Sequence, residues 1–278
     1  MRFSGSSHYI ADDNLTEVVN LSIAMEIPLL LKGEPGTGKT QLAKEIATTL
    51  GLPLFVLNVK SSMKAVDALY QYDTLTRLND ARFGDSKRCV SNIKDYIRMG
   101  KIGQAFFADR RAVLLIDEID KADSDFQDDL LDVLDQMTFD IIEIDETVRA
   151  IHRPIIIITS NAKRDLSDPF LGRCNFHHIS FPNPDFMRRI VLAHLPTIED
   201  KLIDQALTRF YQIREFPQIE KPPATRELIH WVRALAMENV PVDRLRKEVP
   251  FLGVLLKKTE DVQLTRRALS GRTVASPY

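Results

Sequence analysis

The glycine-rich segment that ends in a lysine and a threonine is the first part of the chain that could do chemistry. It reads Gly33-Glu34-Pro35-Gly36-Thr37-Gly38-Lys39-Thr40, followed by Gln41, and fits the pattern GxxxxGK[ST] between an apolar run and a helical pattern. Backbone N–H groups in such a loop can point at phosphates, and the dipole of the following helix adds to their attraction. Lys39 would reach the β- and γ-phosphates, and the Thr40 hydroxyl would bind Mg²⁺. The motif predicts a site for ATP and Mg²⁺ over residues Gly33–Gln41.

Two adjacent carboxylates follow a second apolar run, Ala112–Ile116. Asp117 would hold the Mg²⁺ shell, and Glu118 would polarise the attacking water. A second carboxylate directly after the first favours hydrolysis by water over transfer to another acceptor. The alternative is that two solvated carboxylates simply end a strand.

A third polar position, Asn161, ends the apolar run that leads through Thr159 and Ser160. Its side chain would sit beside the γ-phosphate and align water if this run is a strand next to the one before the glycine-rich loop. The alternative is an asparagine that caps a strand-to-loop transition.

Five short apolar runs predict the strands that position these residues. Each run is nearly continuous, as expected for strands covered on both faces: Leu29–Leu31, Leu54–Val59, Ala112–Ile116, Ile155–Thr159 and Phe176–Phe181. Helical patterns lie between and after them: Asp12–Met25, Lys39–Leu50, Asp123–Met137 and Asp185–Leu195. This alternation predicts a three-layer α/β fold with a mainly parallel sheet.

The pattern changes to helices alone from Pro196 onward. The helical stretches there are Ile198–Arg214, Thr225–Met237 and Asp261–Leu269, separated by prolines. We therefore predict a nucleotide-binding domain at 1–195 and a small all-helical domain at 196–278. Residues 61–109 hold more than one helix and are expected to form an insertion. Residues 1–7 and 270–278 look unstructured, the latter as a flexible tail.

Composition excludes several classes of protein. The 278 residues are 44% hydrophobic and 27% charged, which is typical of a globular protein. The 2 cysteines make no disulfide framework, and no apolar run is long enough to cross a bilayer. No signal peptide is indicated at the N-terminus, so a cytoplasmic location is expected. A net charge of −2 provides no overall electrostatic attraction to nucleic acid.

Four motifs in a fixed order carry a family resemblance. The segments GEPGTGKT, LLIDEID, ITSN and DPFLGRC resemble those of AAA+ ATPases, over about residues 8–240. Within that class the sequence is similar to the MoxR group, and most similar to its CoxD-like branch. The resemblance implies a P-loop NTPase core whose parallel strands have the order 5-1-4-3-2, followed by a helical lid.

The resemblance also assigns roles to single residues. Asn161 matches sensor 1, Arg173 the arginine finger that enters a neighbouring subunit's site, and Arg226 the sensor 2 arginine of the lid. Tyr9 and Ile10 lie where the family packs adenine, and Thr138–His152 is similar to the hairpin before sensor 1, with Asp145-Glu146 as its turn. Residues 61–109 correspond to the helix 2 insert. Either arginine could instead form a surface ion pair.

The resemblance further implies an oligomeric ring, expected to be a hexamer, that remodels a client protein. Such chaperones drive the maturation of their client proteins or the insertion of metal cofactors into them. They commonly work with a partner that carries a von Willebrand A domain. Tyr70 and Tyr72 could grip a client in a central pore, although helix packing is the favoured role.

Three other functions stay open. A P-loop kinase would need a catalytic base and an acceptor pocket, and Glu118, Asn161 and Arg173 together disfavour it. A DNA-directed AAA+ motor is disfavoured by the near-neutral charge, and a nucleotide-binding scaffold by the presence of Glu118.

Overall fold

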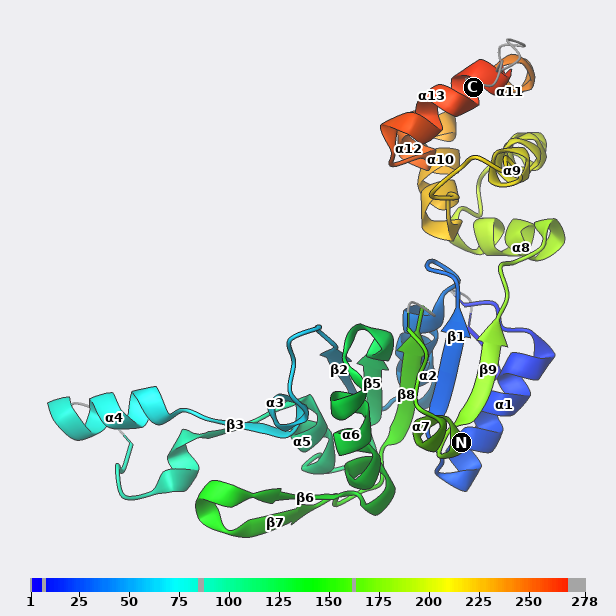
Figure 1. The fold of residues 1–278 in the computed structure, drawn as a ribbon. Coiled ribbons are helices and arrows are strands. Elements are labelled where there is room, and N and C mark those ends of the chain that lie inside the picture. Colours follow the sequence, from blue (N-terminus) through cyan, green and yellow to red (C-terminus); the bar gives the residue numbers. More distant parts are fainter. Residues whose placement is uncertain (1, 7–8, 85–87, 162–163, 270–278) are drawn as a thin grey trace. The chain divides into compact units, whose positions relative to one another are not determined.

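The protein is represented by a computed structural model that describes residues 2–6, 9–84, 88–161 and 164–269. Two compact units share these residues, and both appear in Figure 1. The first comprises residues 1–6, 11–34 and 38–179, and the second comprises 7–10, 35–37 and 180–278.

A parallel sheet forms the centre of the first unit. Its strands are β1 (Leu29–Gly33), β2 (Leu54–Asn58), β5 (Val113–Asp117), β8 (Ile155–Ser160) and β9 (Asn175–Ile179). All neighbours pair in parallel in the order β2-β5-β8-β1-β9, which is the predicted order of second, third, fourth, first and fifth strands. The α/β fold class is therefore confirmed, and each predicted strand exists to within a few residues.

Helices cover both faces of this sheet. They are α1 (Asp13–Met25), α2 (Lys39–Leu50), α3 (Ala65–Leu69), α5 (Lys101–Phe106), α6 (Ser124–Gln136) and α7 (Asp168–Gly172). Leu30, Leu114 and Ile156 share one core with residues of α5 and α6. Alternate residues of a strand face opposite ways, so Leu29, Leu115 and Ile157 point to the other face, and α2 packs on β1, β5 and β8.

The insertion between β2 and β5 contains several short elements. After α3 come β3 (Tyr70–Tyr72), α4 (Thr74–Phe83), the 3-10 turn η1 (Ile93–Tyr96), and β4 (Ile97–Met99), which pairs antiparallel with β3. Figure 1 shows α4 at the far end of the insertion from the central sheet. None of the residues of α4 is buried, and Leu75, Leu78 and Phe83 are exposed.

Tyr70 and Tyr72 take part in packing within the insertion. The Tyr70 ring is buried and stacks on Phe139 at a centroid distance of 6.2 Å, and its hydroxyl accepts a hydrogen bond from Ile142 N. The Tyr72 hydroxyl accepts one from Arg77 Nη1 at 2.7 Å. The Tyr70 contacts join the insertion to the hairpin of β6 (Thr138–Ile141) and β7 (Glu146–Arg149), whereas the Tyr72 contact stays within the insertion. Both tyrosines therefore take part in packing, but from strand β3 and not from a helix.

The turn of that hairpin is longer than predicted and ends one residue earlier. A 3-10 turn, η3 (Ile142–Ile144), and Asp145 with φ 52° make the connection between the strands. Glu146 is the first residue of β7 and pairs with Ile141, so it belongs to the ladder and not to the turn.

The second unit is helical. It contains α8 (Pro184–His194), α9 (Asp200–Arg214), α10 (Thr225–Met237), α11 (Val242–Lys247), α12 (Leu252–Leu255) and α13 (Thr259–Leu269). Trp231 is fully buried in its core and donates through Nε1 to Pro250 O at 2.7 Å. Among the described residues no helix is long and apolar enough to span a membrane.

The units separate earlier in the chain than the sequence suggested. The prediction placed the boundary near 195, whereas the compact units divide between residues 179 and 180. The reason is that Met187 and Val191 of α8 are buried in one core with residues of α9 and α10. Leu195, the residue after α8, is buried in the same core. Helix α8 thus belongs to the helical unit.

The N-terminal segment is another correction. Residues 1–7 were expected to be unstructured, yet Phe3 is buried, with 1% of its surface exposed. Its N–H donates to Asn20 Oδ1 at 2.8 Å, and Asn20 Nδ2 donates back to Phe3 O at 2.7 Å. A buried aromatic ring and a reciprocal pair of hydrogen bonds offset the entropy of ordering this segment. The predicted tail at 270–278 lies outside the described residues.

Candidate nucleotide site

The sheet order brings three distant segments of the chain to one edge. Because β1, β5 and β8 run parallel and β8 lies between the other two, their carboxyl ends are neighbours. Lys39 and Thr40 follow β1, Asp117 ends β5, and Asn161 follows β8. Ligands of open α/β sheets bind at the carboxyl ends of the strands, so this edge is the candidate site.

The glycines of the loop after β1 allow its backbone conformation. Gly36 has φ 84° and Gly38 has φ 92°, a region that residues with a side chain rarely adopt. Helix α2 begins at Lys39, directly after Gly38, which has no side chain to cap the helix. The N–H groups of its first turn are therefore suited to binding an anion.

Lys39 is a buried cation at the start of α2. Only 5% of its surface is exposed, and its ammonium donates to Gly33 O at 2.8 Å and to Glu34 O at 2.9 Å. Burial lowers the pKa of Lys39, while the carboxylates of Asp120 and Asp117 act in the opposite direction. Phosphate oxygens would replace neutral carbonyl acceptors by charged ones and strengthen the hydrogen bonds of this ammonium.

Asp117 accepts two hydroxyl hydrogen bonds through the same oxygen. Thr40 Oγ1 donates to Asp117 Oδ1 at 2.8 Å, and Thr159 Oγ1 donates to it at 2.7 Å. The Thr40 hydroxyl and the Asp117 carboxylate are thus in contact, and both are hard oxygen donors of the kind that Mg²⁺ prefers. The residues present fit a magnesium ion that is bound through these two side chains.

Glu118 is held by its backbone and by its side chain. Its φ is 60°, an uncommon value for a residue with a side chain, and its N–H donates to Thr159 Oγ1 at 2.8 Å. Asn161 Nδ2 donates to Glu118 Oε1 at 2.7 Å, and Lys121 forms an ion pair with Oε2. The structure therefore joins the predicted water-polarising carboxylate directly to Asn161.

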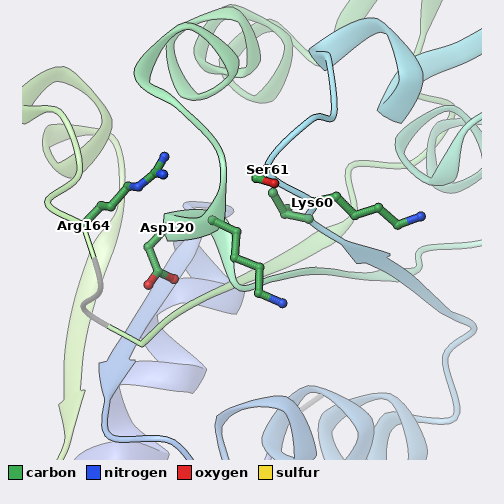
Figure 2. A pocket seen from close by; sticks show the side chains of 6 residues that line it. Lys60, Ser61, Asp120 and Arg164 are labelled. Carbon is green, nitrogen blue, oxygen red and sulfur yellow. The ribbon is translucent and has the colours of Figure 1, made fainter.

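Asp120 lies three residues after Asp117 and anchors the end of β8. Its carboxylate is buried, with 1% of the residue exposed, and Oδ1 accepts a hydrogen bond from Asn161 N at 3.1 Å. Beside it is a pocket of about 500 Å³ lined by Val59, Lys60, Ser61, Asp120, Lys121 and Arg164. Figure 2 shows Asp120 and Arg164 on one side of this pocket and Lys60 with Ser61 on the other.

The remaining predicted site residues lie elsewhere. Arg173 follows α7 and forms an ion pair with Asp135 of α6, and its Nη1 donates to Pro169 O at 3.2 Å. Arg226 is in the first turn of α10 in the helical unit. Tyr9 is buried and Ile10 is half-buried.

Sequence reasoning missed two residues of this site, Thr159 and Lys121. Thr159 was read only as part of an apolar strand, although a hydroxyl at the buried end of a strand must find hydrogen-bond partners. Lys121 was not singled out, and its position three residues after Glu118 was the available signal.

The comparisons agree with this geometry. Residues 28–174, more than half of the chain, match the family "AAA domain (dynein-related subfamily)". The chain belongs to this family. It is accordingly an AAA+ ATPase, and the matched residues contain the loop at Gly33–Thr40, the Asp117-Glu118 pair and Asn161.

A related sequence is the mitochondrial Lon protease homolog of Phaeodactylum tricornutum. It is 30% identical to this chain over 258 residues, which is 86% of the chain and 25% of the relative. This AAA domain chain therefore spans about a quarter of the length of that relative.

Two solved structures of Thermotoga maritima RuvB have the same fold. A point mutant of RuvB aligns with a TM-score of 0.56 at 18% identity, covering 89% of this chain and 72% of RuvB. RuvB described as a Holliday junction branch migration motor aligns with a TM-score of 0.53 at 18% identity, covering 88% and 71%. At this level of identity the likeness concerns the fold alone.

Proposed function

We propose that this chain hydrolyses ATP with Mg²⁺ at the carboxyl edge of its sheet, with Glu118 as the catalytic carboxylate. The observation that carries the proposal is the bond from Asn161 Nδ2 to Glu118 Oε1 at 2.7 Å, beside the contact of Thr40 with Asp117. These contacts bring together the side chains that such a reaction needs for metal, water and phosphate.

Each side chain has a separate task in this proposal. Lys39 and the N–H groups of the loop bind the β- and γ-phosphates. Thr40 and Asp117 hold Mg²⁺, which neutralises charge on the phosphate oxygens. Glu118 accepts a proton from the attacking water, and Asn161 fixes the direction of the Glu118 carboxylate.

Arg173 is proposed to complete the site of a neighbouring subunit. It precedes β9, which starts level with β1: Leu29 is opposite Asn175 in the parallel pairing. Arg173 therefore belongs to the amino edge of the sheet, whereas Lys39 follows the carboxyl end of β1. With 5 residues in β1, the two edges are about 16 Å apart along the strand. This separation supports action in trans.

A finger supplied in trans requires a head-to-tail assembly. Such heterologous contacts close into a ring when the rotation between subunits allows it, and we propose a hexamer by analogy with the family. A planar guanidinium suits the spread charge of the transferring phosphoryl group, and its pair with exposed Asp135 is weak enough to be exchanged.

The helical unit is proposed to act as a lid. By resemblance, Arg226 is the sensor 2 arginine, and Tyr9 and Ile10 contact adenine. Arg226→Ala should then reduce the nucleotide-dependent change in an interdomain distance measured between paired labels. An unaltered change would assign Arg226 to the surface.

The work driven by hydrolysis is proposed to be the remodelling of a protein client. The support is the resemblance to MoxR proteins of the CoxD-like branch, which implies maturation or metal-cofactor insertion and a von Willebrand A domain partner. Helix α4 adds an observation, because it exposes three large apolar side chains, Leu75, Leu78 and Phe83, and exposed apolar side chains are a feature of protein-binding surfaces.

A DNA-directed motor is the second candidate, because one solved structure with this fold is described as a Holliday junction motor. Stimulation of ATP turnover by double-stranded or branched DNA would support it. A net charge of −2 gives no overall attraction to DNA and favours the protein client.

A mixing experiment tests the site and the ring together. Arg173→Ala retains Lys39, Lys39→Ala retains Arg173, and each variant alone should be nearly inactive. Mixed rings contain some interfaces with both groups, so activity should partly return. Wild-type turnover by Arg173→Ala alone, or no recovery in rings shown to be mixed, would refute action in trans.

A further inference from the structure

Two side chains of α9 hold the segment through which the chain enters the helical unit. This connecting segment, residues 180–183, follows β9, precedes α8 and belongs to the helical unit. Tyr211 Oη donates to Pro182 O at 2.6 Å, and the Arg214 guanidinium carbon lies 3.5 Å from the centroid of the Phe181 ring. The position of α9 is therefore tied to that of the connecting segment.

Aromatic packing fixes the Phe181 ring. The ring stacks on Phe210 at a centroid distance of 6.1 Å and meets the Tyr211 ring edge-on at 6.4 Å. Phe210 is fully buried in the core of the helical unit. A guanidinium over the face of an aromatic ring is attracted by the negative charge of that face. The ring therefore holds the guanidinium of Arg214 in a defined position.

Arg214 also holds the residues that precede α10. Its Nη1 donates to Pro223 O at 2.6 Å, and α10 begins two residues later, at Thr225. Arg226 is the second residue of this helix. Ala224 occupies the N-cap position and has no side-chain oxygen that could cap the helix. The start of α10 therefore depends on contacts made by other elements, and the bond from Arg214 is one of them.

The two contacts of this side chain require an arginine. A guanidinium is planar, so its face can stack on a ring while the N–H groups in its plane donate to a carbonyl. A lysine keeps the charge but has no planar group, and it cannot make both contacts in this way. Arg214 thus joins the connecting segment to the start of the helix that carries Arg226.

We infer that Arg214 is a positioning residue that couples Arg226 to the connecting segment. This inference rests on the proposed role of Arg226 in the lid. When Arg226 engages the nucleotide, a force on the start of α10 reaches Phe181 and Pro182 through α9. The lid can then respond to the nucleotide as one body, because the start of α10 and the connecting segment do not shift separately.

A neutral variant of Arg214 tests the coupling. Arg214→Gln loses the stacked cation, and the nucleotide-dependent change in the interdomain distance between paired labels should fall to less than half of the wild-type change. The rate of ATP hydrolysis should fall about three- to ten-fold. Arg214→Lys should behave like Arg214→Gln, because charge alone does not provide both contacts. An unaltered distance change in Arg214→Gln would overturn the inference.

Arg209 provides a matched control on the same helix. Its Nε donates to Leu245 O at 2.8 Å and its Nη2 to Arg246 O, at the end of α11 and not at the start of α10. Arg209→Gln therefore also removes hydrogen bonds to backbone carbonyls, and its stability in urea should fall as that of Arg214→Gln does. Its distance change and its rate should stay at the wild-type level. An equal loss of the distance change in Arg209→Gln would show a general effect on the helical unit and overturn the inference.

A double variant separates this inference from the proposed function. In the Arg226→Ala background, Arg214→Gln should have no further effect on the distance change or the rate, because Arg214 acts through Arg226. Losses that multiply in the double variant would overturn the coupling. A wild-type distance change in Arg226→Ala alone would refute the role of Arg226 itself. A reduced change in Arg226→Ala with an unaltered one in Arg214→Gln would refute only the role of Arg214.

Discussion

Thr159 links the two carboxylates of the candidate site, so removal of its hydroxyl is a sharp test of the geometry. The hydroxyl donates to Asp117 Oδ1 at 2.7 Å and accepts from Glu118 N at 2.8 Å, and the residue is 1% exposed. Thr159→Val removes both hydrogen bonds and preserves the shape of the side chain. Glu118 N–H is then left without its acceptor.

The cost follows from those two contacts. A buried polar group that loses its partner costs about 1–3 kcal/mol, and the half-buried positions of Asp117 and Glu118 favour the lower half of that range. The hydrogen bond also holds Glu118 at φ 60°, a conformation that costs roughly 1–2 kcal/mol. Once released, Glu118 can relax away from Asn161. If the misplacement of Glu118 raises the activation free energy of hydrolysis by about 1.4 kcal/mol, the rate falls about tenfold.

The assay compares three proteins. For Thr159→Val we expect kcat to fall about tenfold, with little change in nucleotide affinity measured by a fluorescent ATP analogue, because Lys39 and its loop are untouched. The free energy of unfolding in urea should fall by about 1–2 kcal/mol. Thr159→Ser keeps the hydroxyl and should retain most of the rate. A Thr159→Val protein with wild-type rate and stability would refute the reasoning.

Two further predictions concern the thiols and the insertion. A hydrogen bond with Ser91 lowers the pKa of exposed Cys89, whereas burial raises that of Cys174 to about 12, so iodoacetamide at pH 8 should modify Cys89 first. Intact mass should show one fast addition that is absent in Cys89→Ser; equal labelling of both thiols would contradict this. Tyr70→Phe should cost about 1 kcal/mol through the lost bond to Ile142 N, and Tyr70→Ala about 3–5 kcal/mol, in urea unfolding. A Tyr70→Ala protein as stable as wild type would place the ring outside the core.

The sheet was predictable because burial on both faces makes its strands apolar throughout. Leu114, Leu115 and Ile116 are all fully buried, so this run reads as a strand without any alternation. The edge strand β9 pairs with β1 alone and exposes Phe176, and the polar His177 and His178 interrupt its apolar run.

The boundary of the helical unit was not predictable in the same way. An amphipathic helix shows that one of its faces is buried, but it does not show against which partner. Met187 and Val191 of α8 pack with the helices that follow them in the sequence. Only the three-dimensional contacts assign this helix to its unit.

In the candidate site, too, the spacing of residues predicts some features and not others. The motifs predict chemistry directed at a nucleotide, yet the same side chains are bound to the protein itself in the described structure. Lys39 donates to Gly33 O at 2.8 Å, and Arg173 pairs with Asp135. Such partners are expected, because a polar group left unpaired away from water is costly. These partners can also be exchanged. Lys39 bonds to neutral carbonyls, and the ion pair of Arg173 with Asp135 is half-exposed, so phosphate oxygens can replace both kinds of partner.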